Sequence, residues 1–172
     1  VGAKVLLVDL DPQGNASTGL GIAPEQRKAT SYDLLIEERA LAELIKPTQT
    51  QGLDIVPANS DLSSADIDLV ANEKRSFLLH DALRHGAGPD YDFILIDCPP
   101  SLSLLTLNGL TSAHGVIVPM QCEYFALEGL SDLVNSIKQV HANLNRDLHL
   151  IGLLRVMFDP RITLQQQVSD QL

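Results

Sequence analysis

Five continuous runs of apolar residues constrain the fold of this chain more than any other feature of its sequence. They lie at 4–11 (KVLLVDLD), 53–58, 92–100, 115–121 and 149–159. Each run is short and apolar almost throughout, which is typical of a strand buried on both faces rather than of a strand with one face in water. Such strands need cover on both sides, so the runs predict a parallel sheet inside an α/β protein.

Segments with helical periodicity lie between these runs. Apolar residues return every three or four positions at 31–45, 64–86 and 123–145, and again in the last ten residues, 163–172. Strand and helix therefore alternate, which predicts a doubly wound, mostly parallel sheet with helices on both faces. The sequence contains no fixed repeat and no long linker, so it predicts a single domain over 1–172.

Composition and charge exclude several classes of protein. Twelve Lys and Arg against 22 Asp and Glu give a formal net charge of −10, so no overall positive field exists to gather nucleic acid or an anionic membrane. No apolar run approaches the roughly 20 residues of a membrane span, and the first residues do not resemble a signal peptide. We therefore expect a cytoplasmic protein. Cys98 and Cys122 stand far apart, which favours buried thiols over a disulfide or a zinc site.

Acidic residues stand where two of the predicted strands end. Asp9 and Asp11 close the first apolar run, and Asp97 closes the third. Ligands of open parallel sheets bind beyond the carboxyl ends of the strands, so the three carboxylates converge if these two strands are neighbours. Carboxylates packed together resist ionisation unless a cation lies among them. The sequence therefore predicts a hard divalent ion, best Mg²⁺ held partly through water and phosphate.

The loop after the first strand also favours a phosphate ligand. In PQGNASTGLG (12–21), glycines and small polar residues let the backbone approach a ligand closely. The run that ends in Asp97, followed by Cys98-Pro99-Pro100, has the form of a Walker-B strand, whose aspartate orients the metal ion in nucleoside triphosphatases. For each aspartate taken alone, a turn or a helix cap remains the alternative.

The sequence resembles the ParA/Soj-type partition ATPases, relatives of MinD in the deviant Walker-A P-loop group, in four stretches: KVLLVDLDPQGNASTGLG, YDFILIDCPPSLSLLTLNGL, VIVPMQCEYFALEGLSDL and GLLRVMFDPR. The resemblance extends over essentially the whole chain. It implies a P-loop NTPase-like fold, ATP and Mg²⁺ as cofactors, and ATP-dependent chromosome or plasmid partitioning as the function. It also implies a homodimer that closes on ATP and binds DNA nonspecifically at the nucleoid, a centromere-binding ParB-like partner, and no membrane.

The same resemblance implies roles for individual residues. Asp11 is expected to be the catalytic residue, which positions or activates the water that attacks the γ-phosphate. Asp9 is expected to help organise the Mg²⁺ shell, and Asp97 to contact Mg²⁺ through water. Pro99 belongs to an expected switch, residues 98–101, that senses the γ-phosphate. Three more residues are expected near the nucleotide or the dimer face: Glu123, Met157 and Asp159.

The sequence departs from that family at one motif. No GxxxxGK[ST] phosphate loop occurs in the 172 residues, and the family's KGGVGKTT loop would stand roughly 30 residues before DLDPQ. We therefore expect an incomplete domain that begins at the Walker-A′ strand, is truncated at both ends and does not hydrolyse ATP by itself. The strand that carries Phe93 to Ile96 is then expected to present an open edge.

Three other functions stay open. A MinD-like ATPase that places machinery at a membrane would differ in a C-terminal amphipathic helix. A receiver-like phosphorylation pocket also gathers aspartates at strand ends, but it needs a lysine on a late strand, and the only lysine after Asp97 is Lys138, in a helical pattern. A non-catalytic interaction module would keep the fold for protein contacts, although intact aspartates favour an enzyme site.

Overall fold

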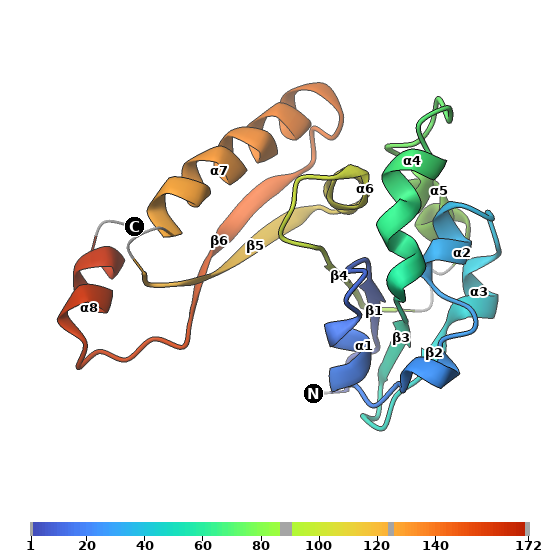
Figure 1. Cartoon of the computed structure of the whole chain (residues 1–172), viewed down its shortest axis with the longest axis horizontal. Helices are drawn as coiled ribbons and strands as arrows, with labels where there is room; N and C mark the ends of the chain where they lie inside the picture. Colours follow the sequence, from blue (N-terminus) through green and yellow to red (C-terminus); the bar gives the residue numbers. More distant parts are fainter. Residues whose placement is uncertain (1, 87–90, 124–125, 171–172) are drawn as a thin grey trace. The chain divides into compact units, whose positions relative to one another are not determined.

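The computed structural model describes residues 2–86, 91–123 and 126–170 (Figure 1). It consists of two compact units, Val1–Ser112 and Ala113–Leu172. Strands and helices alternate in both units, so the predicted α/β class is confirmed. The single domain expected over the whole chain stays a prediction.

The first unit contains a four-stranded sheet with the order β2-β3-β1-β4. Its strands have these bounds: β1 Val5–Asp9, β2 Lys46–Pro47, β3 Leu53–Val56 and β4 Phe93–Asp97. β1 is parallel to both β3 and β4, whereas β2 is a short antiparallel strand that no apolar run had indicated. The sheet is mostly parallel, as predicted, and the two strands that end in aspartate are neighbours.

Six helices and two 3₁₀ turns are described in the first unit. They are α1 Asn15–Gly19, η1 Pro24–Gln26, α2 Ser31–Leu35, α3 Leu41–Leu44, η2 Ser60–Ser64, α4 Ala65–Asp68, α5 Leu78–Gly86 and α6 Leu104–Ser112. Helices form within both predicted segments, 31–45 and 64–86, but neither segment is one continuous helix. Glu38 has a φ of 50°, which an α-helix excludes, and the Asn72 side chain accepts a hydrogen bond from the Lys74 amide in place of a helical bond.

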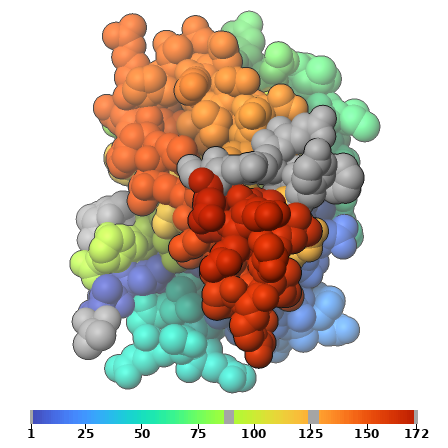
Figure 2. Space-filling model, turned by 90° about the vertical axis from the view of Figure 1, so that its left-hand side faces the viewer, coloured from blue at the N-terminus to red at the C-terminus, as the bar shows by residue number. Residues whose placement is uncertain are grey.

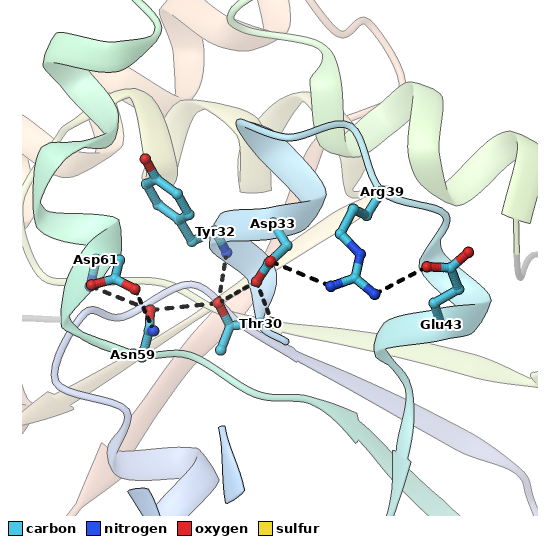
Figure 3. Close-up of polar contacts among 7 residues, drawn as sticks. All are labelled: Thr30, Tyr32, Asp33, Arg39, Glu43, Asn59 and Asp61. Carbon is cyan, nitrogen blue, oxygen red and sulfur yellow. Dashed lines mark hydrogen bonds and ion pairs between the residues drawn. The ribbon is translucent and has the colours of Figure 1, made fainter. Parts of the chain in front are cut away.

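A polar network joins the start of α2 to the segment before η2 (Figure 3). The Thr30 amide donates to the Asp33 carboxylate at 2.8 Å, and the Thr30 hydroxyl lies 3.4 Å from Asn59 Oδ1. Arg39 bridges Asp33 and Glu43 at 3.5 and 3.1 Å, which links α2 to α3. These contacts hold the connection between β1 and β3 in a defined path over the core.

The core of the first unit lies against one side of the sheet. Its fully buried side chains come from the sheet and from the surrounding helices and turns: Leu6, Val8, Leu10, Leu35, Leu44, Val56, Ala58, Ala65 and Leu79. β4 contributes only one face, because Ile94 and Ile96 pack against the core while Phe93 and Leu95 are 62% and 53% exposed. Among the described residues β4 pairs with β1 alone, so it presents the open edge expected from the sequence.

The second unit pairs two parallel strands, β5 Gly115–Gln121 and β6 His149–Val156. Helix α7, Ala126–Asn143, connects them and runs along them (Figure 1), and α8, Thr163–Ser169, follows β6. Figure 2 shows the segment that contains α8, in red, at the surface. The predicted strands and helices are thus confirmed here, except at 124–125 and 171–172, which lie outside the described residues. No described helix has the length and apolar character needed to cross a bilayer.

Candidate functional site

Three carboxylates converge where β1 and β4 end. The register of the two strands pairs Asp9 with Asp97, and neighbouring strands lie about 4.8 Å apart. The Leu10 amide donates to the Asp97 carbonyl at 2.8 Å, so the ladder continues past Asp9 toward Asp11. The structure therefore brings Asp9, Asp11 and Asp97 together at the carboxyl edge of the sheet, as the strand-end rule predicts.

Asp9 is fully buried, and protein donors surround its carboxylate. One oxygen accepts the Asp11 amide at 3.1 Å, and the other accepts the amide and the hydroxyl of Ser17 at 2.9 and 2.6 Å. The Ser17 hydroxyl in turn accepts the Ala58 amide at 3.0 Å, and the Ser31 hydroxyl donates to the Asp9 carbonyl. Asp9 thereby ties β1 to α1, to the exit of β3 and to α2.

Asp11 starts a tight turn that leads into α1. Its carboxylate accepts the Gln13 amide at 3.0 Å, and its carbonyl accepts the Gly14 amide at 2.8 Å. Gly14 has a φ of 61°, in the left-handed region, and a Cβ atom there would lie 2.4 Å from Nη1 of Arg27. The turn therefore requires glycine at this position. It leaves the Asp11 side chain half-buried at the edge of the site.

The buried guanidinium of Arg27 packs against Gly14 of this turn. It donates to the Thr18 hydroxyl at 2.7 Å, to the Ile22 carbonyl at 2.7 and 3.0 Å, and to the Ala58 carbonyl at 3.4 Å. All of these acceptors are neutral oxygens, so the N–H groups of the guanidinium are hydrogen-bonded without a carboxylate. The loop 12–21 contains Ser17, but no sequence pattern indicates that Ser17 and Arg27 both bond the distant Ala58.

The electrostatics of the site favour a cation. Burial raises the pKa of Asp97, and the charges of Asp9 and Asp11 raise it further. Burial and, to a smaller extent, Asp97 raise the pKa of the Cys98 thiol to about 12, so this thiol stays neutral. Among the described residues, no group of three or more His, Cys, Asp or Glu is arranged to hold a metal ion. Mg²⁺ needs only one or two protein carboxylates when water and phosphate oxygens complete its coordination shell.

The loop after Asp97 is held by helix α6. Pro99 is buried, and its carbonyl lies 3.3 Å from the Thr106 hydroxyl, which lies 2.6 Å from the Ser101 carbonyl. The amide of Leu104, at the start of α6, donates to the Asp66 carboxylate at 2.8 Å. The expected switch region therefore has a defined conformation, to which a polar residue of α6 contributes.

The remaining predicted residues belong to the second unit. Glu123 is exposed after β5, and Met157 is 81% exposed, with a φ of 52°. The Asp159 carboxylate pairs with Arg161 at 2.7 Å, and hydrogen bonds from Arg161 lower the pKa of Asp159. The predicted residues thus divide between the units, with Asp9, Asp11, Asp97 and Pro99 in the first. The roles of all of them stay predictions.

Comparisons with known proteins identify similar sequences. The profile of a family described as AAA domain matches residues 1–150. The chromosome partitioning protein ParA of Myxococcus xanthus is 49% identical over 169 residues, which cover 98% of this chain and 59% of that protein. The sporulation initiation inhibitor protein Soj of Bacillus subtilis is 45% identical over 172 residues, which cover 100% of this chain and 68% of that protein.

A solved structure shares the fold. It is the crystal structure of cobyrinic acid a,c-diamide synthase from Mycobacterium smegmatis with a bound ATP analog and magnesium, and it matches with a TM-score of 0.93 at 40% identity. The match covers 99% of this chain and 67% of that chain. The chain therefore spans about three-fifths to two-thirds of the length of these proteins.

Proposed function

The chain belongs to the AAA domain family together with the ParA and Soj proteins, and from this premise we propose that the whole protein is an ATP-dependent chromosome or plasmid partitioning ATPase. One observation carries the proposal beyond family membership. Asp9, Asp11 and Asp97 meet at the carboxyl edge of β1 and β4, where an α/β sheet binds its ligand. The positive charge of Mg²⁺ suits these three acids, and the phosphate oxygens of a nucleotide would complete its coordination shell.

In the proposed mechanism Asp11 acts on water. Its half-buried carboxylate lies at the start of α1, with one oxygen engaged by the Gln13 amide, and it orients the water that attacks the γ-phosphate. Asp97 would hold Mg²⁺ through a water molecule. Bound Mg²⁺ would neutralise charge on the phosphates. Burial and then the repulsion of Asp9 and Asp11 raise the pKa of Asp97, and the repulsion supports a cation at this point.

The geometry of Asp9 supports an indirect role at the metal. Its carboxylate is enclosed and already accepts three hydrogen bonds from Asp11 and Ser17. Asp9 holds the backbone of Asp11 and would thereby organise the Mg²⁺ shell, in the manner of the residues that orient metal ligands in other sites. This proposal assigns the direct chemistry to Asp11 and Asp97.

The proposed partners follow from the family. We propose an ATP-dependent homodimer in the cytoplasm that binds nucleoid DNA nonspecifically and is stimulated by a centromere-binding ParB-like protein. Three residues of the second unit, Glu123, Met157 and Asp159, are proposed to lie near the nucleotide or the dimer face. The net charge of −10 means that contact with DNA depends on a local basic patch rather than on the overall field of this chain.

Replacement of Asp11 in the full-length protein tests this function. Asp11→Ala should retain ATP binding and accumulate the ATP-bound dimer, while hydrolysis falls by about 10²- to 10⁴-fold, the usual contribution of a positioned base. Phosphate release and size-exclusion chromatography with ATP measure the two effects. The matched control is Glu25→Ala, which removes an exposed acid from the turn after α1. Hydrolysis by Asp11→Ala at the parent rate would contradict the assignment.

A second candidate function rests on the structural match to the cobyrinic acid a,c-diamide synthase, which has a TM-score of 0.93. A synthase of this kind would hydrolyse ATP faster as cobyrinic acid and an amide donor are added. A partitioning ATPase would turn over ATP in proportion to DNA and a ParB-like partner. Measuring ATP turnover with each pair of additions separates the two. The partitioning relatives match at the higher identities, 45% and 49% against 40%.

A further inference from the structure

Helix α6 carries three buried polar side chains, Thr106, Asn108 and Thr111, which are 7%, 0% and 2% exposed. Each donates to a backbone carbonyl that precedes the helix: Ser101 for Thr106, Arg75 for Asn108 and Ser76 for Thr111, at 2.6, 2.7 and 2.6 Å. Buried polar groups need such partners, so α6 is anchored to two segments. One segment is the loop after Asp97, and the other leads into α5.

The loop of residues 98–101 depends on this anchor. Pro99 and Pro100 have no amide proton, so the loop lacks two of the donors that a backbone normally uses to hold itself. In the part of the chain that the structure describes, the donors to the Pro99 and Ser101 carbonyls are the Thr106 hydroxyl and the Ser103 amide. Thr106 has a single proton, which points mainly to Ser101, the nearer acceptor.

We propose that Thr106 is a positioning residue for the phosphate-sensing loop of residues 98–101, a role that rests on the proposed ATPase function. The loop is fixed to the sheet at one end, where the Leu10 amide donates to the Asp97 carbonyl. Thr106 fixes it at the other end through the Ser101 carbonyl. A loop that is held at both ends is already ordered when the terminal phosphate of a ligand reaches it. The free-energy cost of ordering the loop therefore does not add to the barrier of the reaction.

Thr111 provides a matched control for a purely structural role. It lies on the same helix, is equally buried and donates to a carbonyl at the same distance of 2.6 Å, but its acceptor Ser76 lies outside the loop. Valine has the shape of threonine without the hydroxyl, so Thr106→Val and Thr111→Val each remove one donor from a part-buried hydrogen bond to a carbonyl. Similar losses of thermal stability are therefore expected, and only Thr106→Val should disturb the loop.

The first measurement is steady-state ATP hydrolysis by the full-length protein. Thr106→Val should lower kcat about tenfold, equivalent to about 1.4 kcal/mol at the transition state, with ADP affinity unchanged because ADP has no γ-phosphate. Thr106→Ser should restore the parent rate, because it keeps the hydroxyl. Thr111→Val should hydrolyse ATP like the parent. Equal losses of kcat in the two valine variants would overturn the proposal.

The second measurement needs no hydrolysis. Amide hydrogen exchange at Ser103, whose amide donates to the Ser101 carbonyl at 3.1 Å, should without nucleotide be about tenfold faster in Thr106→Val than in Thr111→Val, because the loop opens locally. Unchanged exchange in Thr106→Val would overturn the positioning role whatever the rate of hydrolysis. If the parent protein hydrolyses no ATP, the ATPase function fails, while faster exchange specific to Thr106→Val still supports the role of Thr106 in holding the loop.

Discussion

Asp97 lies close to the negative charges of Asp9 and Asp11. Removing the charge of Asp97 should therefore stabilise the metal-free protein. The folded state raises the pKa of Asp97, so it holds this proton more tightly than the unfolded chain does. Ionisation of Asp97 therefore lowers stability as the pH rises through the folded-state pKa, and this loss is absent below the unfolded pKa of about 3.9. Asp97→Asn should be more stable than the parent at pH 7, by less than about 1 kcal/mol because solvent screens the partly exposed side chain.

Thermal unfolding from pH 3 to pH 8 in the presence of a chelator measures this effect. The difference in melting temperature between Asp97→Asn and the parent should disappear toward pH 3. The control Glu73→Gln replaces an exposed acid and should melt at the same temperature as the parent. In the full-length protein the same Asp97→Asn change should weaken Mg²⁺-dependent ATP binding. A variant that is less stable than the parent at pH 7 would show that Asp97 has a structural role instead.

Glycine is required at one end of α1 and not at the other. Gly14→Ala places a Cβ at a φ of 61° and 2.4 Å from Nη1 of Arg27, so the guanidinium must move. We expect a loss of about 2–4 kcal/mol, from the left-handed backbone and from weakened hydrogen bonds. Gly19→Ala, in the same helix, meets no atom within 4 Å and should stabilise by up to about 1 kcal/mol. Urea unfolding measures both, and equal effects would contradict the tight turn.

At the scale of elements, continuous apolar runs predict five strands of the two sheets well. They do not predict α6, because its buried positions include Thr106, Asn108 and Thr111, so no apolar stripe marks one face. Periodicity also cannot show that Glu38 interrupts a helix, since its positive φ depends on the surrounding structure.

The acidic residues of the candidate site were predictable because a strand-end aspartate is visible in the sequence itself. Ser17 and Arg27 were not predictable, since both bond Ala58, which lies 41 and 31 positions along the chain from them. Contacts across such separations exist only after folding. Sequence thus indicates where a ligand binds better than it indicates what supports the site.

For the whole molecule, the open edge of β4 predicts self-association of the 172-residue chain. Phe93 and Leu95 are exposed on a strand whose outer edge pairs with no other described strand, which is the usual template for pairing between chains. Leu95→Lys should lower light scattering several-fold at a given concentration. The control is Val70→Lys, which removes an apolar side chain that is 63% exposed, against 53% for Leu95, and lies away from the sheet. Equal reductions in both variants would assign association to apolar exposure in general.

The hydrogen bonds of Asp9 predict how mutations at this residue would appear in a genetic screen. Because one carboxylate connects β1, α1 and the turn of Asp11, a substitution there removes a folding contact together with a group of the candidate site. Cells degrade proteins whose stability falls by a few kcal/mol. In a screen for loss of function, alleles at Asp9 would therefore appear as missing protein, whereas alleles at Asp11 would appear as abundant, inactive protein that can interfere with the wild-type copy.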